Sequence, residues 1–208
     1  AEAAGRRPGD RDNVHVVLNA ADQTVEALDL VVVGNLLRVK ATGDGWSAER
    51  QASAVYSFDW GPLQLVSLGE APDDKDLAWL ERDLASLRPG ASVVLYFHFP
   101  LDGAYSTGQW FGDGDYRDKF VKILAGKPVA GIFHGHYHAA GIYRYQGFDV
   151  YRTGSPKHRW HTFTVATVDD RTMRVASFDY DTNTWVWWHE KPLAGGPEVR
   201  WVDSRVPP

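Results

Sequence analysis

The amino-acid sequence predicts an α/β protein built from two packed β-sheets flanked by helices. Strand and helix patterns alternate through the first two thirds of the chain, and short strands follow one another from residue 141 onward. With 208 residues and no cysteine, the chain is long enough to bury a hydrophobic core without disulfide bonds. The absence of cysteine also excludes thiolate metal sites and cysteine nucleophiles.

The first predicted elements are strands. Apolar runs predict strands at residues 13–18 (NVHVVL) and 28–34 (LDLVVVG), and the second run is apolar enough to be buried on both faces. Residues 56–69 (YSFDWGPLQLVSLG) predict two short strands joined by a turn at Gly61-Pro62. This part of the chain is therefore expected to contribute strands to both sheets.

Two helices are predicted in the middle of the chain. Residues 73–88 carry leucines at helical spacing, acidic residues in the first turn, and a Pro-Gly stop after the last turn. Residues 115–126 form a second amphipathic pattern that ends at a glycine. A buried strand is predicted between the helices at 91–98, and another follows them at 128–138.

The last third of the chain predicts strands only. Turn residues at Gly147, at Asp169-Asp170 and from Asp181 to Asn183 separate short alternating segments. The predicted strands are 141–147, 148–154, 161–168, 172–179 and 184–189. We expect one domain over 14–190, with a flexible N-terminal segment at 1–13 and a C-terminal tail at 191–208.

Composition narrows the classes of function. A net charge of −5 argues against an extended nucleic-acid surface, because phosphate binding there relies on clustered Lys and Arg side chains. The longest apolar runs fall short of the roughly 20 residues of a membrane-spanning helix, so no membrane span is expected. Residues 1–13 show no signal peptide. A secreted or organellar location after loss of an N-terminal segment is the alternative.

Polar residues collect where three predicted strands end. His98 closes one strand, three histidines (His134, His136 and His138) occupy alternate positions at the next strand end, and Asn35 follows Gly34 at a third. Ligands in open α/β sheets gather at the carboxyl ends of strands. Imidazole nitrogens and amide oxygens bind divalent cations, so these strand ends indicate a site of metal-binding ancestry.

Several stretches resemble a known family. The segments VVLYFHFP, VAGIFHGHYHAAG and FDVYRTGSPK are similar to the C-terminal half of the calcineurin-like metallophosphoesterases, and the resemblance covers about residues 54–180. It implies an α-β-β-α sandwich of two mixed sheets with flanking helices, here with a reduced N-terminal half. It also implies a phosphoric ester hydrolase, in which metal-activated water attacks a phosphoester.

The resemblance assigns site residues by position. His98 matches the strand-end ligand, His136 and His138 match the Gly-His-x-His ligands, and Asn35 matches the asparagine ligand. His134 precedes the motif glycine and is not carried over. In the loop at 154–161, Lys157 and Arg159 are expected to contact the phosphate of a small-molecule phosphoester. The implied cofactor is a divalent metal, namely Mn, Fe, Zn or Mg.

The N-terminal metal motifs of the family are missing or degenerate. Leu36 stands where the Gly-Asn-His motif would place its histidine, and no Asp-x-His or Gly-Asp-x-x-Asp precedes it. In a second alignment Asn35 replaces the bridging aspartate, and Asp22 and Gln23 are remnants of the first motif. Either way the bridging carboxylate is absent, so we expect at most one ion in this chain.

Three interpretations follow. The chain is a metallophosphoesterase whose N-terminal half is removed or supplied by another chain, with weak or no hydrolysis by this chain alone. Alternatively, it is a pseudoenzyme that serves as a scaffolding subunit of a larger assembly. A third interpretation is a ligand-binding module that uses the late tryptophans.

Overall fold

The structure of the chain is a computed structural model. It describes residues 14–18, 37–42, 45–50, 55–69, 72–103, 114–155, 161–169, 171–193 and 200–202.

A six-stranded sheet forms the centre of the molecule. Its strands run in the order β4-β5-β6-β7-β9-β8, with β5, β6, β7 and β9 parallel to one another and the two outer strands antiparallel. The strands are β4 (Val55–Trp60), β5 (Leu63–Leu68), β6 (Ser92–Phe97), β7 (Val129–His134), β8 (Ala140–Tyr145) and β9 (Phe148–Thr153). Parallel pairing brings the carboxyl ends of four strands to one edge of the sheet.

A second sheet of five strands is antiparallel in all its pairs, in the order β1-β10-β11-β12-β13. Its strands are β1 (Val14–Leu18), β10 (Thr162–Val168), β11 (Thr172–Asp179), β12 (Thr184–Pro192) and β13 (Arg200–Val202). A separate antiparallel pair joins β2 (Leu37–Thr42) to β3 (Gly45–Arg50). The sequence did not predict β2, β3 or β13, and β13 lies within the predicted tail.

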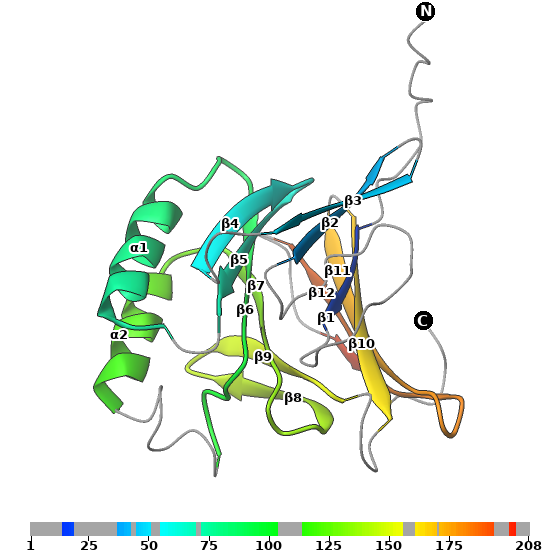
Figure 1. Cartoon of the computed structure of the whole chain (residues 1–208). Helices are drawn as coiled ribbons and strands as arrows, with labels where there is room; N and C mark the ends of the chain where they lie inside the picture. The colour runs from blue at the N-terminus through cyan, green and yellow to red at the C-terminus, as the bar shows by residue number, and fades with distance from the viewer. Residues whose placement is uncertain are drawn as a thin grey trace, which may run out of the picture.

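Two helices lie on one side of the six-stranded sheet, and the five-stranded sheet lies on the other (Figure 1). They are α1 (Asp74–Ala85) and α2 (Gly114–Leu124). A capping box starts α1: the Asp73 carboxylate accepts from the Lys75 and Asp76 amides, and the Asp76 carboxylate accepts from the Asp73 amide. Neither helix has the length and apolar character to cross a bilayer.

Side chains on the two faces of the six-stranded sheet belong to two different hydrophobic clusters. The helix-side cluster consists of Val66, Leu68, Leu77, Leu80, Leu84, Val93, Leu95, Phe97, Leu101, Phe120, Leu124, Ile132 and Val150. The inter-sheet cluster consists of Leu63, Leu65, Val94, Tyr96, Ala130, Phe133, Tyr151, Ala166, Val168, Met173, Val175 and Leu193. Both faces of β5 and β6 are therefore buried, as expected for parallel strands covered on both sides.

Polar contacts also join the two sheets. The Tyr151 hydroxyl lies 2.7 Å from Nδ1 of His189, and both residues are buried. The Asp149 carboxylate accepts from Lys191 Nζ at 2.5 Å and from Arg144 Nε at 3.1 Å. Because Asp149 and Tyr151 lie on β9 whereas His189 and Lys191 lie on β12, these contacts hold the sheets face to face.

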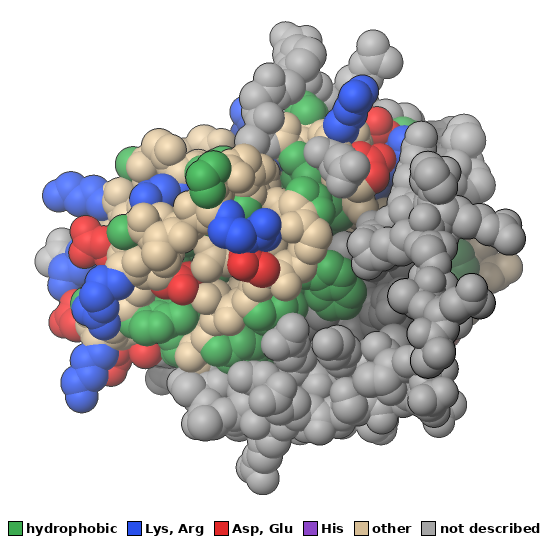
Figure 2. All heavy atoms as spheres, turned by 90° about the horizontal axis from the view of Figure 1, so that it is seen from above, with side chains coloured by type: hydrophobic (Ala, Val, Ile, Leu, Met, Phe, Trp, Pro, Cys, Tyr) green, Lys and Arg blue, Asp and Glu red, His purple; other side chains and the backbone are tan. Residues whose placement is uncertain are grey.

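Charges of both signs mix on the described surface. Figure 2 shows Lys and Arg side chains beside Asp and Glu side chains over the helical part of one end of the molecule. At the same end, Arg88 Nε lies 2.9 Å from the Asp59 carboxylate. Such interspersed charge is typical of a solvated surface.

The predicted fold class is confirmed: two sheets pack together with helices beside them. One strand prediction was too long, because β7 ends at His134 rather than continuing to residue 138. The predicted strand at 28–34 lies outside the described residues.

Candidate functional site

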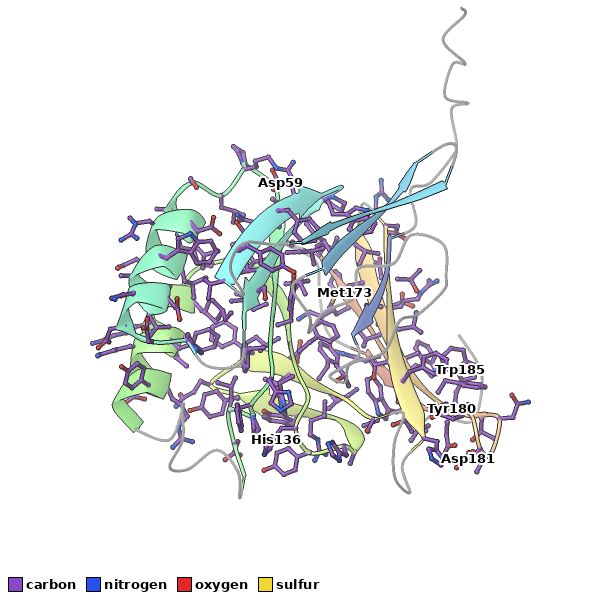
Figure 3. The ribbon with its side chains drawn as sticks, in the orientation of Figure 1. Asp59, His136, Met173, Tyr180, Asp181 and Trp185 are labelled. Atoms are coloured by element: carbon purple, nitrogen blue, oxygen red, sulfur yellow. The ribbon has the colours of Figure 1, made fainter. Side chains whose placement is uncertain are left out.

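His98 and His136 meet at the carboxyl edge of the six-stranded sheet. His98 directly follows β6, and His136 lies two residues after the end of β7. The His98 amide donates to the Gly69 carbonyl at 3.1 Å, and the Gly135 amide donates to the His98 carbonyl at 3.1 Å. These bonds tie together the segments that leave β5, β6 and β7. Figure 3 shows His136 at the end of the sheet opposite Asp59.

The two imidazoles are joined by a hydrogen bond between ring nitrogens. His98 Nε2 lies 3.1 Å from His136 Nδ1, and the ring planes are 86° apart. The Phe99 ring contacts both imidazoles, with centroid distances of 4.9 Å to His98 and 4.4 Å to His136. At metal–nitrogen bonds of roughly 2.05 Å, a 3.1 Å separation of the nitrogens corresponds to an angle of about 100° at a shared ion.

The loop after β7 has an unusual backbone. His136 and His138 both have positive φ, at 65° and 58°. Non-glycine residues rarely occupy this left-handed region, so the loop is strained and turns sharply after Gly135. Burial lowers the pKa of His136, and the nearby charge of His138 lowers it further. His136 is therefore held in the neutral form that binds metals.

His134 has a structural environment. Its side chain is 1% exposed, stacks on Phe97, and makes two hydrogen bonds. Nδ1 lies 3.0 Å from the Gly135 carbonyl, so Nδ1 carries the hydrogen and Nε2 accepts from the Tyr143 hydroxyl at 2.8 Å. Burial lowers the pKa of His134 to about 3. This imidazole thus stays neutral and supports the sheet edge.

Two contacts of the loop that carries His136 were not found from the sequence. The Arg152 guanidinium lies over the Tyr137 ring, 5.6 Å from its centroid, and the Tyr137 hydroxyl donates to the Asp102 carbonyl at 3.1 Å. Arg152 belongs to the stretch FDVYRTG, which was interpreted as a strand and as part of the family resemblance, with no role assigned to Arg152 itself. Its alternation gave no sign that this side chain reaches the loop of His136.

The structure describes three of the six predicted site residues. It brings His98 and His136 together, and it places His138 on the same loop with an exposed side chain. The other three, Asn35, Lys157 and Arg159, lie outside the described residues.

The described residues fit a divalent ion only in part. Within the described ranges, no group of three or more His, Cys, Asp or Glu side chains has metal-binding geometry. The histidine pair offers two neutral nitrogens and no carboxylate, and neutral ligands hold hard cations poorly. A complete coordination sphere therefore needs ligands beyond this pair.

The comparisons with known proteins rest on structure. No protein-family model matches the sequence, and no curated protein matches it. Among solved structures, purple acid phosphatase PPD1 from yellow lupin (Lupinus luteus) seeds superposes with a TM-score of 0.52 at 14% identity, covering 65% of this chain and 32% of that chain. PhoD superposes with a TM-score of 0.54 at 11% identity, covering 73% of this chain and 44% of that chain.

These likenesses concern the fold. At 14% and 11% identity, they describe how the strands and helices are arranged and leave the chemistry of this chain to its own residues. The chain spans less than half the length of either protein.

Proposed function

We propose that this chain, which has the fold of the calcineurin-like metallophosphoesterases, binds one divalent ion at its histidine pair and hydrolyses phosphoesters slowly by itself. The observation that carries the proposal is the 3.1 Å approach of His98 Nε2 to His136 Nδ1 at the carboxyl edge of the sheet. Two neutral imidazoles at this separation suit neighbouring positions around one ion.

The residues have separate roles in this proposal. His98 and His136 hold the ion, with His138 and Asn35 as the further ligands that the sequence motifs suggest. Lys157 and Arg159 neutralise the phosphate of the substrate. A divalent ion at such a site lowers the pKa of water and polarises a phosphoryl oxygen. The chain's own contribution is to orient the ligands and to keep the His136 imidazole neutral.

Slow hydrolysis follows from what the sequence lacks. Leu36 cannot protonate a leaving group, and no bridging carboxylate supports a second ion. Each such loss costs roughly 2 to 4 kcal/mol of transition-state stabilisation, by analogy with the deletion of single catalytic groups. Two or three losses remove most of the roughly 10⁶-fold or greater acceleration typical of an enzyme.

The test combines metal binding with turnover. The full chain, His136→Ala and the matched control His161→Ala are dialysed against Mn²⁺ or Zn²⁺, and bound metal is measured by elemental analysis. His161 is a suitable control because its imidazole pairs with Asp181 at the β11–β12 hairpin. We expect one weakly held ion in the full chain and in the control, and none in His136→Ala. Two tightly held ions per chain would contradict the proposal.

Turnover is measured with an aryl phosphomonoester and an aryl phosphodiester in excess Mn²⁺. The expected result is slow, metal-dependent turnover that His136→Ala abolishes and His161→Ala preserves. Fast turnover would point to catalytic residues that the motifs did not identify.

A second candidate function is a non-catalytic scaffolding subunit. The observation in its favour is that the described residues contain no three-ligand group suited to a metal. Equal background rates for the full chain and His136→Ala, together with no bound ion, would favour this candidate. The tryptophan-based alternative has less support, because Trp187 packs against the inter-sheet cluster and stacks on Tyr151.

A further inference from the structure

Arg152 lies at the carboxyl end of β9, beside the loop that carries the histidines. In the sheet it is the partner of His134 on β7 and of Gly141 on β8. Its guanidinium carbon lies 5.6 Å from the centroid of Tyr137, the residue between His136 and His138. The cation therefore sits against the same loop that supplies half of the histidine pair.

The position of the guanidinium is fixed by packing. Tyr137 is anchored on its far side, because its hydroxyl donates to the Asp102 carbonyl. On β8, a Cβ atom at Gly141 would fall 2.4 Å from Arg152 Nη2, so a larger residue there would collide with the guanidinium. The Tyr137 ring and the bare Gly141 backbone together hold the Arg152 side chain in one place.

The charge of Arg152 has no counterpart among the described residues. Three other arginines of the described chain lie next to carboxylates: Arg88 at 2.9 Å from Asp59, Arg144 at 3.1 Å from Asp149, and Arg174 at 2.7 Å from Glu190. No described carboxylate lies within ion-pair distance of Arg152, and its buried Nε has no described hydrogen-bond acceptor. A buried donor without an acceptor is costly unless a ligand satisfies it.

We propose that Arg152 binds the phosphoryl oxygens of a phosphomonoester, with its fork of donors aimed at two oxygens of one group. Arginine suits this role because its planar guanidinium matches phosphate geometry and stays charged at all working pH values. A monoester fits better than a diester because its terminal phosphoryl group presents more oxygens and more negative charge. The placement of that phosphoryl group beside the histidine pair rests on the proposed function, whereas the oxyanion site itself does not.

The test uses inorganic phosphate as the probe, in the absence of divalent ions and with a chelator present. Binding to the full chain, Arg152→Gln, Arg152→Lys and the control Arg171→Gln is measured by calorimetry. Arg171 is a matched control because its side chain is exposed next to the β10–β11 turn. We expect Arg152→Gln to weaken phosphate binding at least about tenfold, Arg152→Lys to weaken it less, and Arg171→Gln to leave it unchanged.

Two readouts keep folding and binding separate. Thermal melting shows whether each variant folds, and amide resonances of Tyr137 and Gly141 in the full chain are expected to shift when phosphate is added. The proposal is overturned if phosphate leaves these resonances unmoved, or if a folded Arg152→Gln binds phosphate like the full chain. In either case Arg152 only covers the Tyr137 ring. Because no metal is present, failure here leaves the metal-binding test of the proposed function unaffected.

Discussion

At the scale of single residues, buried histidines make the fold sensitive to acid. His189 is fully buried and lies 2.7 Å from the Tyr151 hydroxyl across the two sheets. Burial lowers the pKa of His189 to about 4, whereas a histidine in the unfolded chain titrates near 6.5. The unfolded state therefore takes up a proton at a higher pH than the folded state does.

We expect stability to fall as the pH drops from about 6.5 to about 4, because the unfolded chain binds the extra proton across that window. Once the pH is below the folded-state pKa of His189, this residue has lowered the free energy of unfolding by on the order of 3 kcal/mol relative to neutral pH. Urea unfolding at several pH values measures this. In His189→Gln, which keeps a polar side chain but cannot titrate, the pH dependence of the unfolding free energy should be shallower by about one proton. An unchanged slope would show that other groups dominate.

The histidine pair and Arg152 differ in how far the sequence reveals them. A histidine after an apolar run and a Gly-His-x-His stretch mark strand ends, and His98 and His136 lie at such ends in the structure. Their role as metal ligands stays a prediction. Arg152 escaped notice because its surroundings come from Tyr137 on a loop and Gly141 on another strand, and no local pattern connects the three.

At the scale of elements, the start of α1 depends on its capping box. Replacing Asp73 by alanine leaves the amides of Lys75 and Asp76 without their acceptor, which lies at 2.7 and 2.9 Å. We expect a loss of about 1 kcal/mol in the free energy of unfolding, measured with urea. The control is Asp74→Asn, which breaks an exposed ion pair with Lys119 and should change stability little. Equal effects of the two substitutions would argue against the cap.

Gly131 of β7 packs closely against side chains from both sheets. A Cβ atom at this position would lie 2.8 Å from a Tyr151 ring carbon and 3.2 Å from the Met173 methyl. We expect Gly131→Ala to destabilise the protein by roughly 1 to 3 kcal/mol through overpacking, measured as a lower urea midpoint. An unchanged midpoint would mean that the Tyr151 ring moves aside freely.

The lengths of the elements show where sequence patterns stop. The β4–β5 hairpin, both helices and the late strands were predicted from alternation, helical spacing and turn residues, and they are confirmed. The strand end at His134 was missed because His136 and His138 keep the two-residue spacing of a strand while their backbone is left-handed. Strand β13 has three residues, which is too short to show the two-residue alternation of a strand.

At the scale of the whole molecule, a buried ion pair holds the sheets together. The side chains of Asp149 and Lys191 are only 3% and 13% exposed. We expect Asp149→Ala to cost about 3 to 5 kcal/mol, because it leaves a buried ammonium group without its partner. The double variant Asp149→Leu/Lys191→Met should regain most of that loss, since no buried charge then remains.

Both variants are compared by urea unfolding. The surface pair Arg174–Glu190 serves as the control: Arg174→Gln should change stability by no more than about 1 kcal/mol, because both side chains are solvent-exposed. A double variant as unstable as Asp149→Ala would show that the shape of the site matters more than its charge.

The overall architecture was predictable from the sequence, whereas the order of the strands in the sheet was not. Alternation of strands and helices followed by a run of strands indicated two sheets with helices beside them, which the structure and the likeness to PhoD confirm. The pairing of β9 between β7 and β8 depends on contacts between distant segments, which single-sequence patterns do not encode. The domain bounds at 14–190 stay a prediction.

The six-stranded sheet belongs to both hydrophobic clusters at once, and this has a consequence for deuterium exchange. Every residue of β5 and β6 is buried, with alternate side chains facing the helices and the second sheet. If a helix frays or the second sheet detaches, one face of these strands stays covered. Their amides should therefore exchange last, at a rate set by global unfolding, whereas amides of α1 and β12 exchange through smaller openings.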